Sequence, residues 1–185
     1  MKVALSFLGT LLSIGIAAEP VPSAPIGELG KPKPKVETVK NADFSVAAAD
    51  GTPEHWKSAY PTGSIALVKQ GSESFLRVEV KGEEANAGAV QTIAVPKGSS
   101  AALVRGRMRG KPGKAPGAAA QLVFWPKGGN VTIPPTILKS EHSVAWKTAS
   151  REIPLLPTAR TLEISARCVF ATGQFDFDDI EVQFK

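Results

Sequence analysis

Apolar and polar residues alternate with a period of two along most of the chain from residue 41 to residue 185, and Gly- and Pro-rich turns interrupt them. In residues 75–81, for example, Leu76 and Val78 point to one face of an extended chain and Arg77 points to the other. Strands of this kind are predicted at residues 43–48, 64–69, 75–81, 90–95, 102–109, 119–125, 142–153, 160–170 and 174–184. About nine short strands without an intervening helical pattern indicate an all-β fold, either an antiparallel sandwich or a barrel.

The start of the chain has the pattern of an export signal. Lys2 is followed by an uncharged apolar stretch at residues 3–16, and small residues surround the expected cleavage point after Ala17. The apolar stretch is shorter than the ~20 residues that a helix needs to cross a bilayer. We therefore predict a signal peptide at residues 1–17, a secreted or periplasmic protein, and no membrane span once the signal has been removed.

Residues 18–40 are predicted to form an extended tether, because their prolines prevent regular pairing and their lysines repel one another. The alternative is a basic arm that contacts an acidic surface. The folded domain is then residues 41–185. Lys2 and the tether lysines lie outside the folded part, which is nearly balanced in charge, so we expect no nucleic-acid partner.

Several segments carry a family resemblance, and in chain order they are Asn41-Ala42-Asp43-Phe44, Trp56, residues 63–68, 74–78 and 90–98, Trp146, Ile153-Pro154, and residues 162–164 and 173–180. In order and spacing they resemble the jelly-roll carbohydrate-binding modules of bacterial cellulases and xylanases, which are galactose-binding-like β-sandwiches. The resemblance covers residues 41–185. It implies a two-sheet antiparallel jelly roll, a structural calcium near the chain ends, and a glycan site on the concave sheet or its edge loops.

The candidate calcium ligands lie at the two ends of the domain. Calcium prefers several hard oxygen ligands, and Asp178 and Asp179 in the last segment offer carboxylates. The resemblance implies that such residues meet an acidic residue from the start of the domain. The family usually has a glutamate where this chain has Ser45, so Asp43 is the candidate replacement. The alternative is a solvated strand end without a metal.

Trp125 is the candidate stacking platform for a sugar ring, since it ends a predicted strand and precedes a Gly-containing loop. Gln121 shares its strand face and is the candidate hydrogen-bonding partner for sugar hydroxyls. Burial in the core is the alternative for Trp125, because tryptophan is buried on average. Core packing is predicted for Trp56 and Trp146, and burial for Cys168, which lies in the apolar register of its strand.

Three arginines fall on one face of the strand predicted at residues 102–109, namely Arg105, Arg107 and Arg109. Guanidinium groups suit carboxylates and sulfates, so this row is a candidate site for an acidic polysaccharide, and with Trp125 nearby it would form a cleft. The alternative is a solvated outer sheet face on which the arginines pair with acidic residues such as Glu79 or Glu163.

Taken together, these patterns predict a protein that binds a polysaccharide or cell-surface glycan without catalysis. The alternative is a structural or protein-interaction sandwich of the cell envelope, with another envelope protein as its partner. Exposure of Trp125 and the arginine row in a groove would favour glycan binding, whereas burial of Trp125 would favour the interaction protein. No nucleophile elbow, zinc-binding helix or phosphate loop is present in the sequence. A polysaccharide lyase would require Tyr60 or a histidine, His55 or His142, to meet arginines in that groove.

Overall fold

The structure is a computed structural model that describes residues 39–82, 86–113, 119–129, 133–141, 143–169 and 172–185. These residues form ten β-strands and no helix, and they belong to one compact unit. None of them therefore forms a helix that is long and apolar enough to cross a membrane. The predicted signal peptide, and the predicted tether as far as residue 38, lie outside the described residues.

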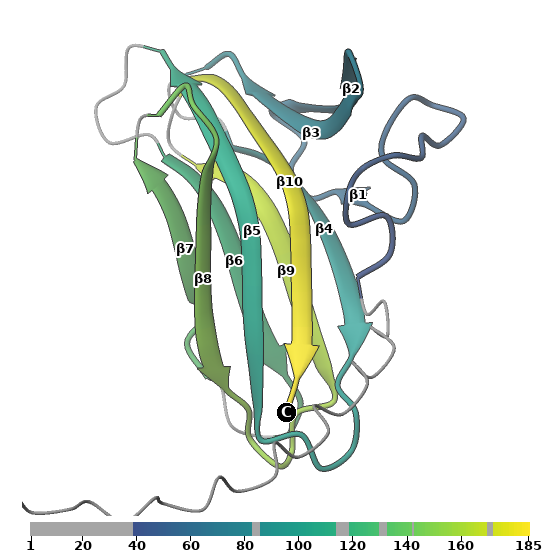
Figure 1. Ribbon diagram of the computed structural model, residues 1–185, viewed down its shortest axis with the longest axis vertical. Helices are drawn as coiled ribbons and strands as arrows, with labels where there is room; N and C mark the ends of the chain where they lie inside the picture. The colour runs from purple at the N-terminus through teal and green to yellow at the C-terminus, as the bar shows by residue number, and fades with distance from the viewer. Residues whose placement is uncertain (1–38, 83–85, 114–118, 130–132, 142, 170–171) are drawn as a thin grey trace, which may run out of the picture. The chain divides into compact units, whose positions relative to one another are not determined.

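The strands form two sheets of five strands each, and all hydrogen-bonded neighbours are antiparallel. Sheet A has the order β1 (Lys57–Ser58), β4 (Asn86–Ala94), β9 (Thr161–Val169), β6 (Ala119–Lys127) and β7 (Thr136–Glu141). Sheet B has the order β2 (Ser64–Gln70), β3 (Glu73–Val80), β10 (Gly173–Phe184), β5 (Ala101–Pro112) and β8 (Lys147–Pro154). In Figure 1, β8, β5 and β10 of sheet B face the viewer, and β6 and β9 of sheet A lie behind them. The predicted antiparallel two-sheet sandwich is confirmed.

The core is formed by the inward side chains of both sheets. Along β9, for example, Leu162, Ile164, Ala166 and Cys168 are all fully buried, as the period-two pattern of this segment predicts. Burial of a large apolar side chain stabilises the fold by ~1.5–3 kcal/mol. Burial also raises the pKa of the Cys168 thiol to about 12, so the prediction of a buried cysteine is confirmed.

A β-bulge in β10 lets both halves of this long strand bury apolar residues. Before the bulge, Phe177 points into the core and Asp178 points outward. The register with β5 shifts between Asp178 and Glu181, and Asp179 has a φ of 49°. The extra residue reverses the alternation, so that Ile180 points into the core although it has the parity of Asp178. The acidic side chains before the bulge therefore face outward from sheet B.

The observed strands differ from the predicted ones at three places. Residues 43–48 do not form a strand, and their regular pairing is limited to one bridge between Ala47 and Pro53. The short β1 and the edge strand β7 were not predicted, which accounts for ten strands in place of about nine.

Val39 is buried and the backbone of Lys40 exchanges two hydrogen bonds with the side chain of Gln91, so the last residues of the predicted tether belong to the folded part.

Candidate functional site

The outer face of sheet B carries a network of charged and aromatic side chains, which we call the arginine network. Its members are Phe75, Arg77, Arg107, Arg109, Trp146, Asp176, Asp178 and Asp179. The strand order explains the network, because β10 lies between β3 and β5 and brings its outward aspartates between their outward arginines.

Two buried carboxylates hold the three arginines of this network. Asp176 is 5% exposed and accepts hydrogen bonds from Arg77 Nε at 2.8 Å, Arg77 Nη2 at 3.0 Å and Arg109 Nε at 2.8 Å. Asp178 accepts from Arg107 Nη2 at 2.5 Å and Arg107 Nε at 3.2 Å. These charge-assisted bonds raise the pKa of Arg77. The guanidinium groups are therefore neutralised by residues of the chain itself.

Trp146 covers two of these arginines on the outer face. The guanidinium carbons of Arg107 and Arg109 lie 4.7 and 4.4 Å from its ring centroid, and Phe75 meets the ring edge-on at 5.7 Å. Trp146 is half-buried and lies outside the core cluster, so the prediction of core packing is wrong for this residue. It is confirmed for Trp56, which is 4% exposed. The reason for the difference is that Phe75 and the arginine stems offer Trp146 an apolar surface outside the core.

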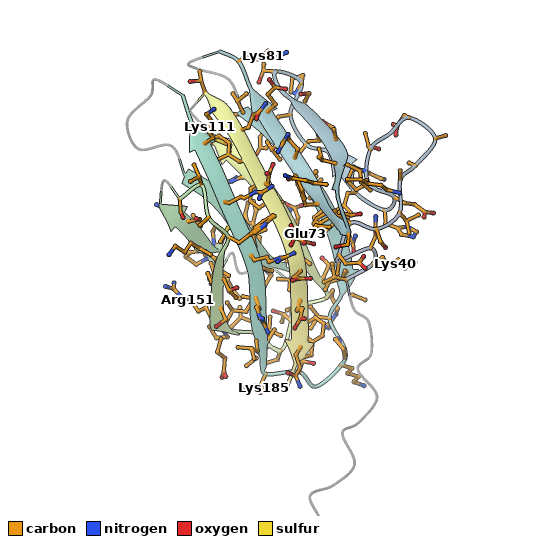
Figure 2. The ribbon with its side chains drawn as sticks, turned by 45° about the horizontal axis from the view of Figure 1, so that its top comes forward. Lys40, Glu73, Lys81, Lys111, Arg151 and Lys185 are labelled. Carbon is orange, nitrogen blue, oxygen red and sulfur yellow. The ribbon has the colours of Figure 1, made fainter. Side chains whose placement is uncertain are left out.

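The arginine row and Trp125 do not form one cleft. The row lies on β5 of sheet B, whereas Trp125 and Gln121 lie on β6 of sheet A. Arg107 also approaches Glu73, 3.5 Å away, which lies over the middle of the sheet B face (Figure 2). The acidic partners of Arg107 and Arg109 are thus Asp176, Asp178, Asp179 and Glu73, and not the expected Glu79 or Glu163. Arg105 is exposed and lies opposite Glu181 in register.

The candidate calcium ligands do not fit a metal site. The carboxylate of Asp178 is taken by Arg107 and by the backbone N–H of Asp179, and Asp179 also lies 3.1 Å from Arg107 Nε. Burial raises the pKa of Asp178, although the bonds from Arg107 oppose this effect. Asp43 is exposed and accepts a bond from its neighbour Ser45. Within the described residues, no three acidic, histidine or cysteine side chains gather as metal ligands. The guanidinium of Arg107 thus already contacts both candidate carboxylates of β10.

Trp125 lies in a depression on the outer face of sheet A, which we call the Trp125 groove. It has a volume of about 310 Å³ and is lined by Ala59, Tyr60, Val90, Val123, Trp125, Glu163, Ser165 and Arg167. The register of the sheet builds it: Val90, Ser165 and Val123 lie side by side on β4, β9 and β6. The small Ser165 between two valines leaves room above the sheet, and Trp125 rises on one side of this row.

Tyr60 and Arg167 form the opposite side of the groove. Arg167 Nη1 donates a hydrogen bond to the Tyr60 hydroxyl at 3.1 Å, although the two residues are far apart in sequence. Gly88 lies opposite Arg167 in register, and a Cβ there would come within 2.7 Å of the Arg167 Cβ and of the Ala166 carbonyl oxygen. The carbonyl of Gly88 also accepts from Ala59 N at 2.9 Å. A side-chain-free residue at position 88 thus lets the segment with Tyr60 lie against β9.

Two buried polar atoms of the Trp125 groove have no hydrogen-bond partner within the described part of the chain. They are the hydroxyl of Ser165, a residue that is 7% exposed, and Nε of Arg167. Such atoms are uncommon in native proteins because burial without a partner costs ~1–3 kcal/mol. Two of the four atoms of this kind in the described residues thus belong to residues that line one depression.

Lys127 and Glu163 close one end of the groove. Lys127 Nζ lies 2.5 Å from Glu163 Oε2 and 4.6 Å from the centre of the Trp125 ring. Both side chains are partly exposed, so their pairing is weak and the lysine is free to rotate away from the ring. The ring of Trp125 is therefore half-buried, with a movable side chain over it.

A second depression adjoins the first on the same face. It has a volume of about 450 Å³, and its lining consists of Lys40, His55, Lys57 and residues 90–94. Val90 lines both depressions, and Lys57 lies opposite Val90 in register. A continuous row of residues therefore leads from β6 across β9 and β4 to Lys57 on β1.

The sequence identified some of these residues and missed others. Trp125 was identified as a candidate, and Gln121 lies on the same face, in register with Arg167. Ser165 and Arg167 were missed, whereas Tyr60 was named only as a residue that a lyase would bring to the arginines. Ser165 and Arg167 alternate with buried residues of β9, so parity alone places them outward. The sequence gives no sign that β9 lies between β4 and β6, which is what brings these side chains to Trp125.

The fold is shared with solved carbohydrate-binding modules. TmCBM61, solved in complex with β-1,4-galactotriose, superimposes with a TM-score of 0.56 at 17% identity, covering 82% of this chain and 100% of that one. The CBM22-1 xylan-binding domain from Paenibacillus barcinonensis gives a TM-score of 0.52 at 13% identity, covering 72% of this chain and 88% of that one. The resemblance read from the sequence is therefore confirmed at the level of the fold.

A different kind of protein shares the fold as well. The enzymatically active domain of tailspike protein 4 from bacteriophage CBA120 superimposes with a TM-score of 0.61 at 12% identity, and the match covers 80% of this chain but 21% of that one. No protein-family model matches the sequence, and no curated protein does. The function must therefore be argued from the site.

Proposed function

We propose that this protein is an exported domain that binds a polysaccharide without cleaving it, and that the Trp125 groove is its binding site. The observation that carries the proposal is the coincidence, in one depression, of a half-buried tryptophan ring with two buried polar atoms that lack partners. Glycan sites need both elements, a flat aromatic face for a sugar ring and fixed polar groups for its hydroxyls.

Each part of the groove has a role in this proposal. A pyranose ring stacks on Trp125 after Lys127 has rotated away. Its hydroxyls accept a hydrogen bond from Arg167 Nε and exchange one with the Ser165 hydroxyl. Val90 and Val123 contact the apolar C–H groups between the hydroxyls. A few hydrogen bonds and one stacked ring give modest affinity, since association has to offset the loss of translational freedom.

The other two functions considered from the sequence are less well supported. A purely structural sandwich gives no reason for Trp125 to lie in a groove beside unsatisfied polar atoms. A lyase is favoured by one observation, the contact between Tyr60 and Arg167. Among the described residues, however, the groove lining includes no histidine, and its one carboxylate, Glu163, is paired with Lys127. Hydrolysis by the usual pair of carboxylates also lacks a second acid there.

A glycan array followed by calorimetry of Trp125 variants tests the proposal. We expect Trp125→Ala to weaken binding of the selected glycan at least tenfold, about 1.4 kcal/mol, and Trp125→Phe to weaken it less. Val144→Ala, at a residue that is 71% exposed and outside the groove, is the matched control and leaves binding unchanged. The proposal is wrong if no glycan binds, or if Trp125→Ala binds like the original chain. Assaying the same mixtures for reducing ends and unsaturated sugars tests for cleavage, and we expect neither product.

A further inference from the structure

Among the side chains that the structure describes, the outer face of sheet A carries more positive than negative charge, whereas that of sheet B does not. Among the outward side chains of sheet A that the structure describes, the basic ones are Lys57, Lys127, Lys139 and Arg167, and the acidic one is Glu163. Glu163 already pairs with Lys127. On sheet B, by contrast, Asp176, Asp178 and Asp179 neutralise the arginines. The groove and its surroundings therefore attract anions.

The excess charge lies at the far end of the row that begins at Val123, next to Trp125. The second depression is lined by Lys40, His55 and Lys57, and no acidic residue is part of its lining. An acidic side chain, Glu54, lies 3.8 Å from His55 and is itself exposed. Both lysines are exposed, and neither has an ion-pair partner within the described residues.

The spacing of the strands sets the length of ligand that would use both depressions. From β6, which carries Trp125, to β1, which carries Lys57, the sheet advances by three strand spacings, or ~14 Å. This distance exceeds the length of one pyranose unit. A ligand that contacts both ends must therefore be a chain of sugars that lies across the strands.

From this arrangement we infer that the preferred ligand is an anionic polysaccharide, a linear chain whose sugars carry carboxylate or sulfate groups. The inference rests on the proposed function and specifies its substrate class. One sugar stacks on Trp125, its neighbour lies over the row of Val90 and Ser165, and an acidic group farther along meets Lys57 and Lys40. Arg167 adds a further cation beside the first sugar.

Matched pairs of anionic and neutral glycans test this inference. One pair is an oligogalacturonate and its methyl ester, and the other is a sulfated galactan oligosaccharide and its desulfated form. Binding of all four is measured by calorimetry at low and at high salt. We expect the anionic member of at least one pair to bind at least tenfold more tightly than its neutral form at low salt, and high salt to reduce this preference. The pair that shows the preference distinguishes carboxylate from sulfate.

Charge-removing variants locate the preference on the protein. The double variant Lys40→Gln/Lys57→Gln should lose at least fivefold in affinity for the anionic glycan and retain its affinity for the neutral one. The matched control is Lys69→Gln/Lys111→Gln, which removes the same charge from exposed positions of sheet B; Figure 2 shows Lys111 near one end of β5. The control should bind like the original chain.

The outcomes separate the two proposals. Equal binding of anionic and neutral glycans, lost in both cases by Trp125→Ala, overturns the inference and leaves the proposed function standing. A preference that the sheet B control reduces as much as Lys40→Gln/Lys57→Gln reflects net charge alone and also overturns the inference. The absence of binding to these four glycans and to every glycan of an array overturns the proposed function, and the inference with it.

Discussion

Replacing Asp176 by alanine should destabilise the protein without changing its glycan binding, because this carboxylate holds two arginines together on the face opposite the Trp125 groove. Asp176 is 5% exposed and bridges Arg77 and Arg109, whose nitrogens lie 2.8–3.0 Å from its oxygens. Without it, two guanidinium groups face each other next to Phe75, which both arginines contact. No other residue of the described chain is seen to bond to both.

The size of the effect follows from the burial of the three side chains. Removing one partner of a fully buried ion pair costs ~3–5 kcal/mol. The side chains of Arg77 and Arg109 are 30% and 21% exposed, so water compensates for part of the loss. We therefore expect Asp176→Ala to lower the free energy of unfolding by about 2–4 kcal/mol. For a domain of this size, this corresponds to a fall in Tm of roughly 6–12 °C.

Urea denaturation and calorimetry measure the effect, and a double-mutant cycle assigns it. Asp176→Asn keeps the volume and one acceptor oxygen, so it should cost less than Asp176→Ala. In the background of Arg77→Met, the loss caused by Asp176→Ala should shrink by at least about 1 kcal/mol, since one of the repelling cations is gone. A loss below about 0.5 kcal/mol for Asp176→Ala, or a tenfold weaker glycan affinity in a variant that remains folded, would refute the assignment of this network to stability.

Three further predictions concern metal binding, the cysteine and the tryptophan ring. Calcium and EDTA should leave Tm unchanged and calcium should produce no heat in a titration, because Asp178 and Asp179 are already paired with Arg107; a calcium-dependent rise in Tm contradicts this. Cys168 should resist alkylation in the native protein at pH 8 and react after unfolding. A thiol with a pKa of about 12 is present as thiolate in roughly one part in 10⁴ at that pH. If Cys168 is alkylated as fast in the native protein as in the unfolded one, it is not buried. Lys127→Ala should bind neutral glycans about two- to fivefold more tightly. It removes an ammonium group whose contact with the Trp125 ring is worth ~0.5–1 kcal/mol and has to be broken before a sugar can stack there. Weaker binding would mean that Lys127 contacts the ligand directly.

Parity along each segment was sufficient to predict which side chains point inward, but not what the outward ones meet. The alternation in β9 correctly buries Leu162 and Cys168, and that in β5 correctly places its arginines on one face. The partners of those arginines depend on which strand lies next to β5. That strand is β10, more than 60 residues away in sequence, and local patterns carry no information on such a pairing.

The bulge at Asp179 and the loop with Trp146 were unpredictable for different reasons. Strict alternation would place Ile180 and Asp178 on the same face, and only an inserted residue with positive φ lets one be buried and the other point outward. Trp146 was expected in the core because the family resemblance places it at a structural position. In the structure, Trp146 is half-buried, and its ring packs against the guanidinium groups of Arg107 and Arg109. An aromatic ring attracts a cation above its face, so this contact can replace burial in the core.

The two outer faces show why basic residues alone did not reveal the binding site. Sheet B has the denser row of arginines, but strand order places carboxylates between them, so an incoming anion would have to displace aspartates that are almost fully buried. Sheet A has fewer cations, yet its register places Ser165 and Gly88 where larger residues would fill the surface, and leaves Arg167 with an unused donor. Binding free energy comes from groups that gain partners on association, and groups that are already paired in the free protein contribute little. By that criterion we expect the face with the Trp125 groove, and not the more highly charged face, to bind a ligand; among the described side chains of the arginine network, Trp146 Nε1 is the buried atom without a partner.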